Sequence, residues 1–214
     1  MKHRRDFLCN CAIASLMGIT FSINDSAFAS GLVGKKRSFC SFQDNQGPEA
    51  MLGKKKWSRE HLRYCIAARD TDDMEEKIWD NEFKLSFDAW AEITPLSFEQ
   101  VGIKEEFDLI ISVGSRRRES FGRSGGVLAW AQMPPTKKFD GILLTKFDLA
   151  ENWILPDSEE HGIILRSVAT HEIGHLLGLY HSDFKNALMY PYLSDAFKPM
   201  EDDIKKIQRL YGTP

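Results

Sequence analysis

The chain has 214 residues, of which 43% are hydrophobic and 28% are charged, and its formal net charge is −3. This length and composition predict one soluble, globular domain with a substantial core, and we expect a monomer. The slightly acidic balance gives no basic surface of the kind that nucleic-acid binding needs, so no nucleic-acid partner is expected. The basic run Lys54–Lys56 is interpreted as solvated surface.

The first 29 residues have the parts of an export signal. A basic start and an interrupted apolar run from Phe7 to Phe21 precede Ala27-Phe28-Ala29, which places small residues ahead of a cut before Ser30. The core RRDFL (residues 4–8) resembles bacterial twin-arginine signals, and the general secretory route stays open. The apolar run is too short to span a bilayer. We therefore expect a bacterial chain exported to the periplasm or secreted, with no stable membrane insertion after processing.

Residues 30–56 show little periodicity and predict a loose lead-in segment ahead of a domain over residues 57–214. Two of the four cysteines, Cys9 and Cys11, would leave with the signal. Cys40 and Cys65 would then remain in an oxidising compartment, where two interpretations are open: one disulfide or two separate thiols.

From Trp57 onward, strand and helix patterns alternate. Strands are predicted at Leu62–Ile66, Leu96–Val101, Leu109–Val113, Val127–Ala131 and Ile142–Thr145. A helix is predicted from the capping residues 70–72 to Trp90, with Met74, Ile78, Leu85 and Ala89 near one face. Two more helices are predicted, from about Glu160 to Leu177 and from about Asp202 to Leu210. This order predicts an α/β fold of one sheet with a few helices.

The stretch HEIGHLLGLYH, residues 171–181, contains three of the six histidines of the chain. His171 and His175 are four residues apart, so on a helix both rings face one ion. A helix that continued would carry His181 away, whereas Gly178 can adopt the left-handed conformation that ends the helix and turns the chain back. The spacing therefore predicts a metal site with three imidazole ligands.

Three protein ligands leave a fourth position for water, as in catalytic rather than structural zinc sites. Zinc lowers the pKa of bound water toward about 7. Glu172, next to the first ligand, is placed to take a proton from this water and to pass it to a departing amine. The sequence thus predicts one catalytic zinc ion with Glu172 as general base and acid.

The motif HExxHxxGxxH with the downstream Met189 resembles the metzincin clan of zinc peptidases. Ser182 and Tyr190 are similar to the matrixin branch, and the likeness extends to residues 87–98, 125–129 and 201–212. The resemblance implies a metzincin-like catalytic domain, a twisted five-stranded mixed sheet with three helices, and a metalloendopeptidase activity. It makes Met189 the packing residue of a Met-turn below the imidazoles, not a ligand.

The same resemblance implies how a protein or peptide substrate lies. The substrate would be extended and would pair its backbone with an edge strand at Leu128 and Ala129. Pro191 and Tyr192 would form the opposite wall, and Ser167 would face the floor of a side-chain pocket or be a plain helix residue.

The sequence departs from the matrixin pattern at the other metal sites. Trp130 and Lys146 stand where matrixins have histidine ligands of a second, structural zinc, so that site is not expected. Asp148 and Glu151 match calcium ligands of the family, but Gly122 stands where an aspartate belongs, and calcium stays an open question.

Matrixins are held inactive by a propeptide cysteine in a PRCGxPD motif, and this chain has no such motif. Cys40 as a cap on the zinc competes with the disulfide to Cys65 as an interpretation. The alternative function, from another class, is a zinc-bound module that captures peptides along the edge strand without hydrolysis. Binding alone would not require Glu172.

Overall fold

The computed structural model describes residues 40, 55–67, 73–114, 121, 126–135 and 137–214. The chain divides into two units, Met1–Lys35 and Lys36–Pro214, and every described residue lies in the second. The predicted export signal therefore lies outside the described residues, as do Gly122 and the capping residues 70–72. Of the predicted lead-in segment, Cys40, Lys55 and Lys56 are described.

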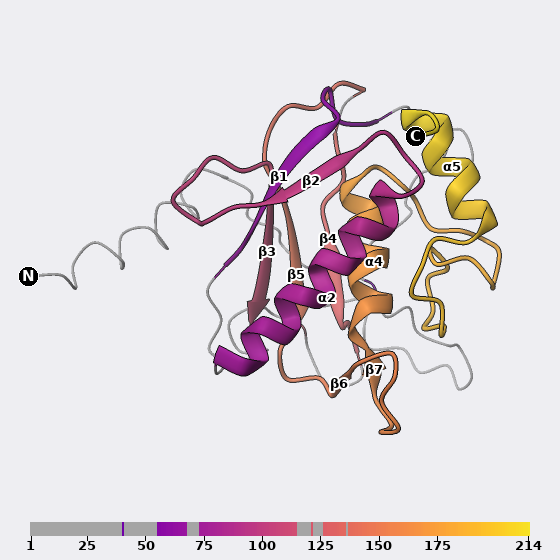
Figure 1. Ribbon diagram of the computed structural model, residues 1–214. Coiled ribbons are helices and arrows are strands. Elements are labelled where there is room, and N and C mark those ends of the chain that lie inside the picture. The colour runs from indigo at the N-terminus through magenta and orange to yellow at the C-terminus, as the bar shows by residue number, and fades with distance from the viewer. Residues whose placement is uncertain (1–39, 41–54, 68–72, 115–120, 122–125, 136) are drawn as a thin grey trace, which may run out of the picture. The chain divides into compact units, whose positions relative to one another are not determined.

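The centre of the second unit is a five-stranded sheet in the order β2-β1-β3-β5-β4 (Figure 1). Its strands are β1 (His61–Ile66), β2 (Ser97–Gln100), β3 (Leu109–Gly114), β4 (Ala129–Ala131) and β5 (Leu143–Asp148). Four strands run parallel, and β4 is antiparallel to β5 at one edge. β3 is buried along most of its length, as expected for a strand inside a parallel sheet.

Three helices accompany the sheet within the described residues: α2 (Asp73–Ala91), α4 (Leu165–Leu176) and α5 (Glu201–Tyr211). α2 packs against α4 and β2, and α4 packs against β4 and β5. The predicted sheet with three helices is thus confirmed. No helix in the described part of the chain is both long and apolar enough to cross a membrane.

Several predicted element boundaries were wrong by a few residues. β4 begins at Ala129 rather than at Val127, and β5 continues to Asp148 rather than ending at Thr145. α5 is one residue longer at each end than predicted, and it closes at Gly212, whose φ is 96°. The extension of β5 matters for the site because it carries Lys146 into the strand pair with β4.

The prediction that a helix begins near Glu160 was wrong. α4 begins at Leu165, and the preceding Ile163–Ile164 forms a short strand, β7, parallel to β6 (Trp153–Ile154). A Cβ at Gly162 would come within 2.6 Å of Ile154 Cγ2, so this close strand contact needs glycine. β-branched residues favour a strand in such a half-buried pair.

The predicted inner face of α2 was right for Ala89, which is buried, and wrong for Ile78. Ile78 is exposed, whereas Trp79, Phe83 and Phe87 are buried. The Phe83 ring lies 5.1 Å from the ring of Phe147 on β5, measured between centroids. Aromatic side chains bury the largest area, so they fix which side of the helix faces the sheet.

Candidate metal centre

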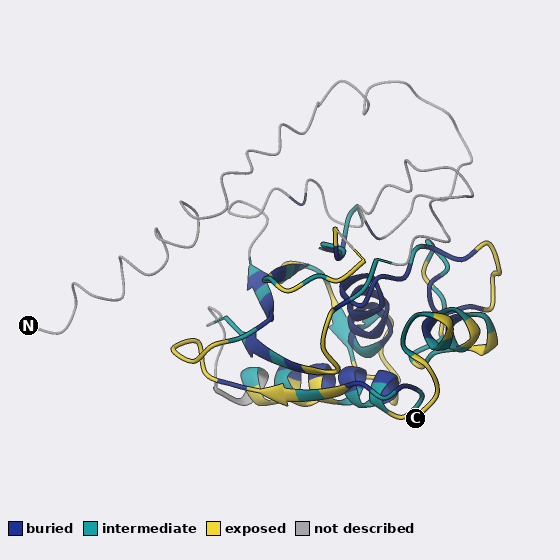
Figure 2. Cartoon of the chain, turned by 90° about the horizontal axis from the view of Figure 1, so that it is seen from above, coloured by how far each residue is buried: buried dark blue, intermediate teal, exposed yellow. Residues whose placement is uncertain are grey.

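α4 is the helix that carries the first part of the predicted metal motif, and it is buried almost throughout (Figure 2). His171, Glu172 and His175 are at most 1% exposed. Spacing by four residues places the two rings on one face, and their centroids are 4.8 Å apart. The helix therefore presents both imidazoles inside the protein.

Gly178 ends this helix in the manner expected from the sequence. Its φ is 102°, and a Cβ there would lie 2.4 Å from the carbonyl oxygen of Lys55. Glycine is thus required both by the left-handed backbone and by the close approach of another segment. The turn returns His181 to the cluster, with its ring centroid 4.8 Å from that of His175 and 5.3 Å from that of His171.

Backbone carbonyls fix the orientation of two of the rings. The Nδ1 atom of His171 donates to the carbonyl of Leu188 at 2.8 Å, and that of His175 donates to the carbonyl of Leu179 at 2.7 Å. A proton held on Nδ1 leaves the Nε2 lone pair for a metal ion, an arrangement typical of metal-binding histidines.

Burial also keeps these rings neutral. It lowers the pKa of His171 to about 3, with a smaller contribution from His181. Burial is likewise the main reason that the pKa of His175 lies well below its usual value. Metal ligation requires neutral imidazole, so the cluster fits a zinc ion that His171, His175 and His181 would hold.

Glu172 follows His171 in α4 and is buried close to the Cys40 thiol. Its two carboxylate oxygens are inaccessible and accept no well-formed hydrogen bond from the described residues. Burial raises the pKa of Glu172 to about 8, and the nearby Cys40 thiol, a weak donor, offsets this only in part. A buried carboxyl next to a group of imidazoles has the position expected of a proton carrier.

Met189 is fully buried, and it is seated by a glycine that the sequence analysis did not single out. A Cβ at Gly174 would lie 2.5 Å from Met189 Sδ and 3.0 Å from Trp90 Cζ2. The missing side chain thus forms a notch in α4 for the methionine. A glycine inside a buried amphipathic helix is the signal that pointed to such a close approach.

Cys40 is the fourth member of the cluster. Its Sγ and one ring nitrogen from each of the three histidines all lie within 4.8 Å of one another. Cys40 and Cys65 are both thiols, so the interpretation as a disulfide was wrong. The two side chains occupy different surroundings, because Cys65 packs in a small apolar cluster with Val101 and Ile110.

The predicted substrate-contacting residues surround β4 and the segment after Met189. Leu128 and Ala129 are buried at the edge of the sheet, and Ala129 forms a parallel bridge with Cys40. Ser167 donates to the carbonyls of Ser194 and Ala196 at 3.2 and 2.7 Å, so its hydroxyl anchors the segment that follows Pro191 and Tyr192. Pro191 and Tyr192 are half-buried.

The positions that the resemblance relates to the two other metal sites of matrixins lie on β4, on β5 and just after β5. Trp130 and Lys146 lie opposite each other on β4 and β5, with Lys146 Nζ 5.6 Å from the Trp130 ring centroid. Asp148 is buried, and its Oδ1 accepts the backbone N–H of Ala150 at 2.9 Å. Among the described residues, Asp148 and Glu151 belong to no group of three or more potential metal ligands.

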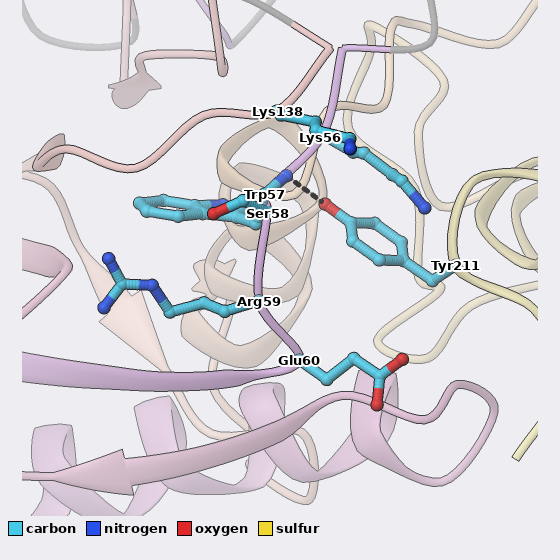
Figure 3. A pocket seen from close by; sticks show the side chains of 7 residues that line it. All are labelled: Lys56, Trp57, Ser58, Arg59, Glu60, Lys138 and Tyr211. Atoms are coloured by element: carbon cyan, nitrogen blue, oxygen red, sulfur yellow. Dashed lines mark hydrogen bonds between the residues drawn. The ribbon is translucent and has the colours of Figure 1, made fainter.

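A surface cavity lies apart from the predicted site residues, between residues 56–60, Lys138 and Tyr211 at the end of α5 (Figure 3). It is lined by Lys56, Trp57, Ser58, Arg59, Glu60, Lys138 and Tyr211. Tyr211 Oη accepts the N–H of Trp57 at 3.2 Å and donates to the carbonyl of Leu177, while Trp57 Nε1 donates to the carbonyl of Leu176. These bonds satisfy the last carbonyls of α4, so this region caps the metal-binding helix.

The family model of Matrixin matches residues 56–212 of this chain. The chain therefore belongs to the matrixin family, which confirms the resemblance found in the sequence. Matrixins use a catalytic zinc ion, in agreement with the predicted cofactor and with the histidine cluster.

Curated relatives support the same assignment. The chain is 34% identical over 202 residues to matrix metalloproteinase-16 of Rattus norvegicus, covering 86% of this chain and 32% of the relative. It is 35% identical over 186 residues to stromelysin-1 of Equus caballus, covering 83% and 37%, respectively. With metalloendoproteinase 1-MMP of Arabidopsis thaliana, the identity is 36% over 171 residues, with 75% and 45% covered. The chain thus spans less than half the length of these relatives.

Proposed function

We propose that this chain is a zinc-dependent endopeptidase that hydrolyses peptide bonds in protein substrates with water as the nucleophile. The observation that carries the proposal is the convergence of His171, His175 and His181, with the buried Glu172 next to His171 in the helix and close to Cys40 of the cluster. Membership of the matrixin family supports it.

His171, His175 and His181 would hold the zinc ion, which when bound would lower the pKa of water toward about 7 and polarise the carbonyl group under attack. Glu172 takes the proton that the attacking water loses and later donates it to the departing amine nitrogen. His171 and His175 keep their Nδ1 protons on backbone carbonyls throughout, which holds both rings in one orientation.

The substrate backbone adds to the outer edge of β4 at Leu128 and Ala129, and Pro191 and Tyr192 form the facing wall. Support comes from the place of β4 at the end of the strand order. The backbone at Cys40 already forms a bridge with Ala129, which indicates that an extended segment fits along this edge.

The same contact suggests how the enzyme is kept latent. Cys40 caps the metal centre as a thiolate until the lead-in segment is displaced, because its Sγ lies among the ring nitrogens. Thiolate is a strong zinc ligand and would fill the position that water needs.

Residues 1–29 are an export signal and residues 30–56 a lead-in to the catalytic domain, residues 57–214, which acts outside the cytoplasm. The basic start, the apolar run and the small residues before Ser30 support this division. Amino-terminal sequencing of the exported protein should begin at Ser30.

The decisive experiment compares wild type with Glu172→Gln on a mixed peptide library, with zinc counted per chain. Both proteins should hold about one zinc, and the variant should cleave roughly 10²- to 10⁴-fold more slowly, because only the proton carrier is lost. Equal zinc with no cleavage by either protein, even after removal of the lead-in, would instead favour a non-hydrolytic binding module.

A second pair of variants tests latency in the same assay. Cys40→Ser should cleave faster than wild type, whereas Cys65→Ser, which removes a thiol from an apolar cluster elsewhere, should not. Equal rates for Cys40→Ser and wild type would exclude the cap and leave the endopeptidase proposal intact.

A further inference from the structure

The backbone of Leu188 and Met189 is hydrogen-bonded on both sides. Its two N–H groups donate to the Asp203 carboxylate: the Leu188 nitrogen lies 2.7 Å from Oδ2, and the Met189 nitrogen lies 3.1 Å from Oδ1. Its two carbonyls accept hydrogen bonds from groups near the metal cluster. The Leu188 carbonyl accepts from His171 Nδ1 at 2.8 Å, and the Met189 carbonyl accepts from the N–H of Ser182 at 2.8 Å. Ser182 directly follows His181, so this short segment connects α5 with two of the three histidines.

Asp203 is held independently of the segment that it binds. It is fully buried in the first turn of α5, and its Oδ2 also accepts the N–H of Met200 at 2.8 Å, immediately before that helix. The carboxylate is thereby fixed to α5, and the 188–189 backbone must follow it.

We propose that Asp203 is a positioning residue for the metal centre, which orients His171 and His181 through the backbone of Leu188 and Met189. The carboxylate touches neither histidine. It determines the position of the Leu188 carbonyl, which accepts the hydrogen bond from the His171 ring. It also determines the position of the Met189 carbonyl, which accepts the hydrogen bond from Ser182, the residue after His181.

A neighbouring contact supports the same role for this turn of α5. Ser182 Oγ donates to Asp202 at 2.5 Å, and Lys206 Nζ lies 2.8 Å from the same carboxylate oxygen. The loop that carries His181 is thus bound to the helix by a side chain as well as through the 188–189 backbone.

The inference rests on the proposed function only in taking the histidines as zinc ligands, so its test measures zinc binding rather than cleavage. In Asp203→Asn, an amide of the same shape keeps one oxygen but turns an NH₂ group toward a backbone N–H. Outer-shell changes of this kind typically weaken metal affinity about 10- to 100-fold. Competition with a chromophoric chelator on the full chain should show a loss of that size.

Glu201→Gln is the matched control, because Glu201 lies in the same turn, is exposed, and its side chain accepts a hydrogen bond from Lys205 on the surface of the helix. Its zinc affinity should stay within about twofold of wild type. A purely structural role for Asp203 would lower the unfolding midpoints of the metal-free and zinc-loaded protein equally. Unchanged affinity in a folded Asp203→Asn would overturn the proposal.

A measurement on wild type keeps the test decisive if Asp203→Asn does not fold. Coupling between two sites is reciprocal, so zinc must strengthen the bonds to Asp203 if these bonds strengthen zinc binding. Removing zinc should accelerate hydrogen exchange at the amides of Leu188 and Met189 more than at Ile110 and Ile111 in β3. Equal acceleration at both places would also refute the role of Asp203.

Discussion

The histidine cluster and the β4–β5 strand pair differ in what holds each of them together. In the cluster, three imidazoles and the Cys40 thiol are buried together, and His175 Nε2 lies 3.3 Å from His181 Nε2. Such a group of imidazole nitrogens can hold a metal cation. In the strand pair, Lys146 lies over the Trp130 ring, and Thr145 Oγ1 donates to the Trp130 carbonyl at 3.0 Å. In this strand pair, the Lys146 ammonium group is the cation, so no metal ion is needed there.

This difference shows that a chain can share one metal site with its family and lack another, so each site must be inferred from its own residues. The chain has the three clustered histidines of the motif, but it has a cation–π contact at the two positions that the resemblance relates to histidine ligands of a structural zinc. We therefore expect one region to depend on metal and the other to be indifferent to it, and three substitutions test this contrast.

The largest effect is expected from His175→Ala. The change removes the central ligand, whose ring is close to both other rings, so bound zinc should fall from about one ion per chain to nearly none. Peptide cleavage should be lost with it. Metal analysis by mass spectrometry after dialysis measures the effect.

His161→Ala is the control for that loss, because His161 is exposed and lies outside the cluster. It should keep its zinc and its activity. If His175→Ala held as much zinc as the control, the cluster would not be the metal centre.

An intermediate effect is expected from Gly174→Ala, which fills the notch below the metal ligands. The new Cβ would meet Met189 Sδ at 2.5 Å and Trp90 at 3.0 Å, and overpacking of this kind costs about 1–3 kcal/mol of unfolding free energy. Urea unfolding of the zinc-loaded protein measures the cost.

Gly102→Ala gives the reference, since its Cβ would meet only the flexible end of Glu105, at 3.3 Å. Stability should change little there. A Gly174→Ala protein as stable as this reference would show that Met189 yields without cost, and that the notch does not hold it.

Sequence reasoning found the local parts of the site and missed the long-range ones. The spacing of His171, His175 and Gly178 is a property of one helix and its end, so it could be read directly. Asp203 could not be recognised in this way, because its role comes from N–H groups of a turn that only the fold brings to α5. The Cys40 contact is equally non-local, so the sequence offered it only as one of two competing interpretations.

The errors in the fold have the same origin. The pattern around Glu160 suits a helix by composition, but pairing of Ile163–Ile164 with β6 decides its conformation. On α2, spacing alone did not separate the stripe with Ile78 from the stripe with Phe83. The sheet settles the choice, because the Phe83 ring meets Phe147 there.

The smallest effect, and the sharpest test of the contrast, is expected from Lys146→Met. The variant keeps an apolar stem but removes the charge over Trp130, and such contacts contribute about 0.5–1 kcal/mol at partly exposed sites. A double-mutant cycle with Trp130→Leu in urea unfolding isolates this coupling. The coupling should be the same with and without chelator, and zinc per chain should not change. A coupling that disappeared with the metal would show that the β4–β5 pair and the histidine cluster are one metal-dependent unit, because β4 also carries Ala129 beside Cys40.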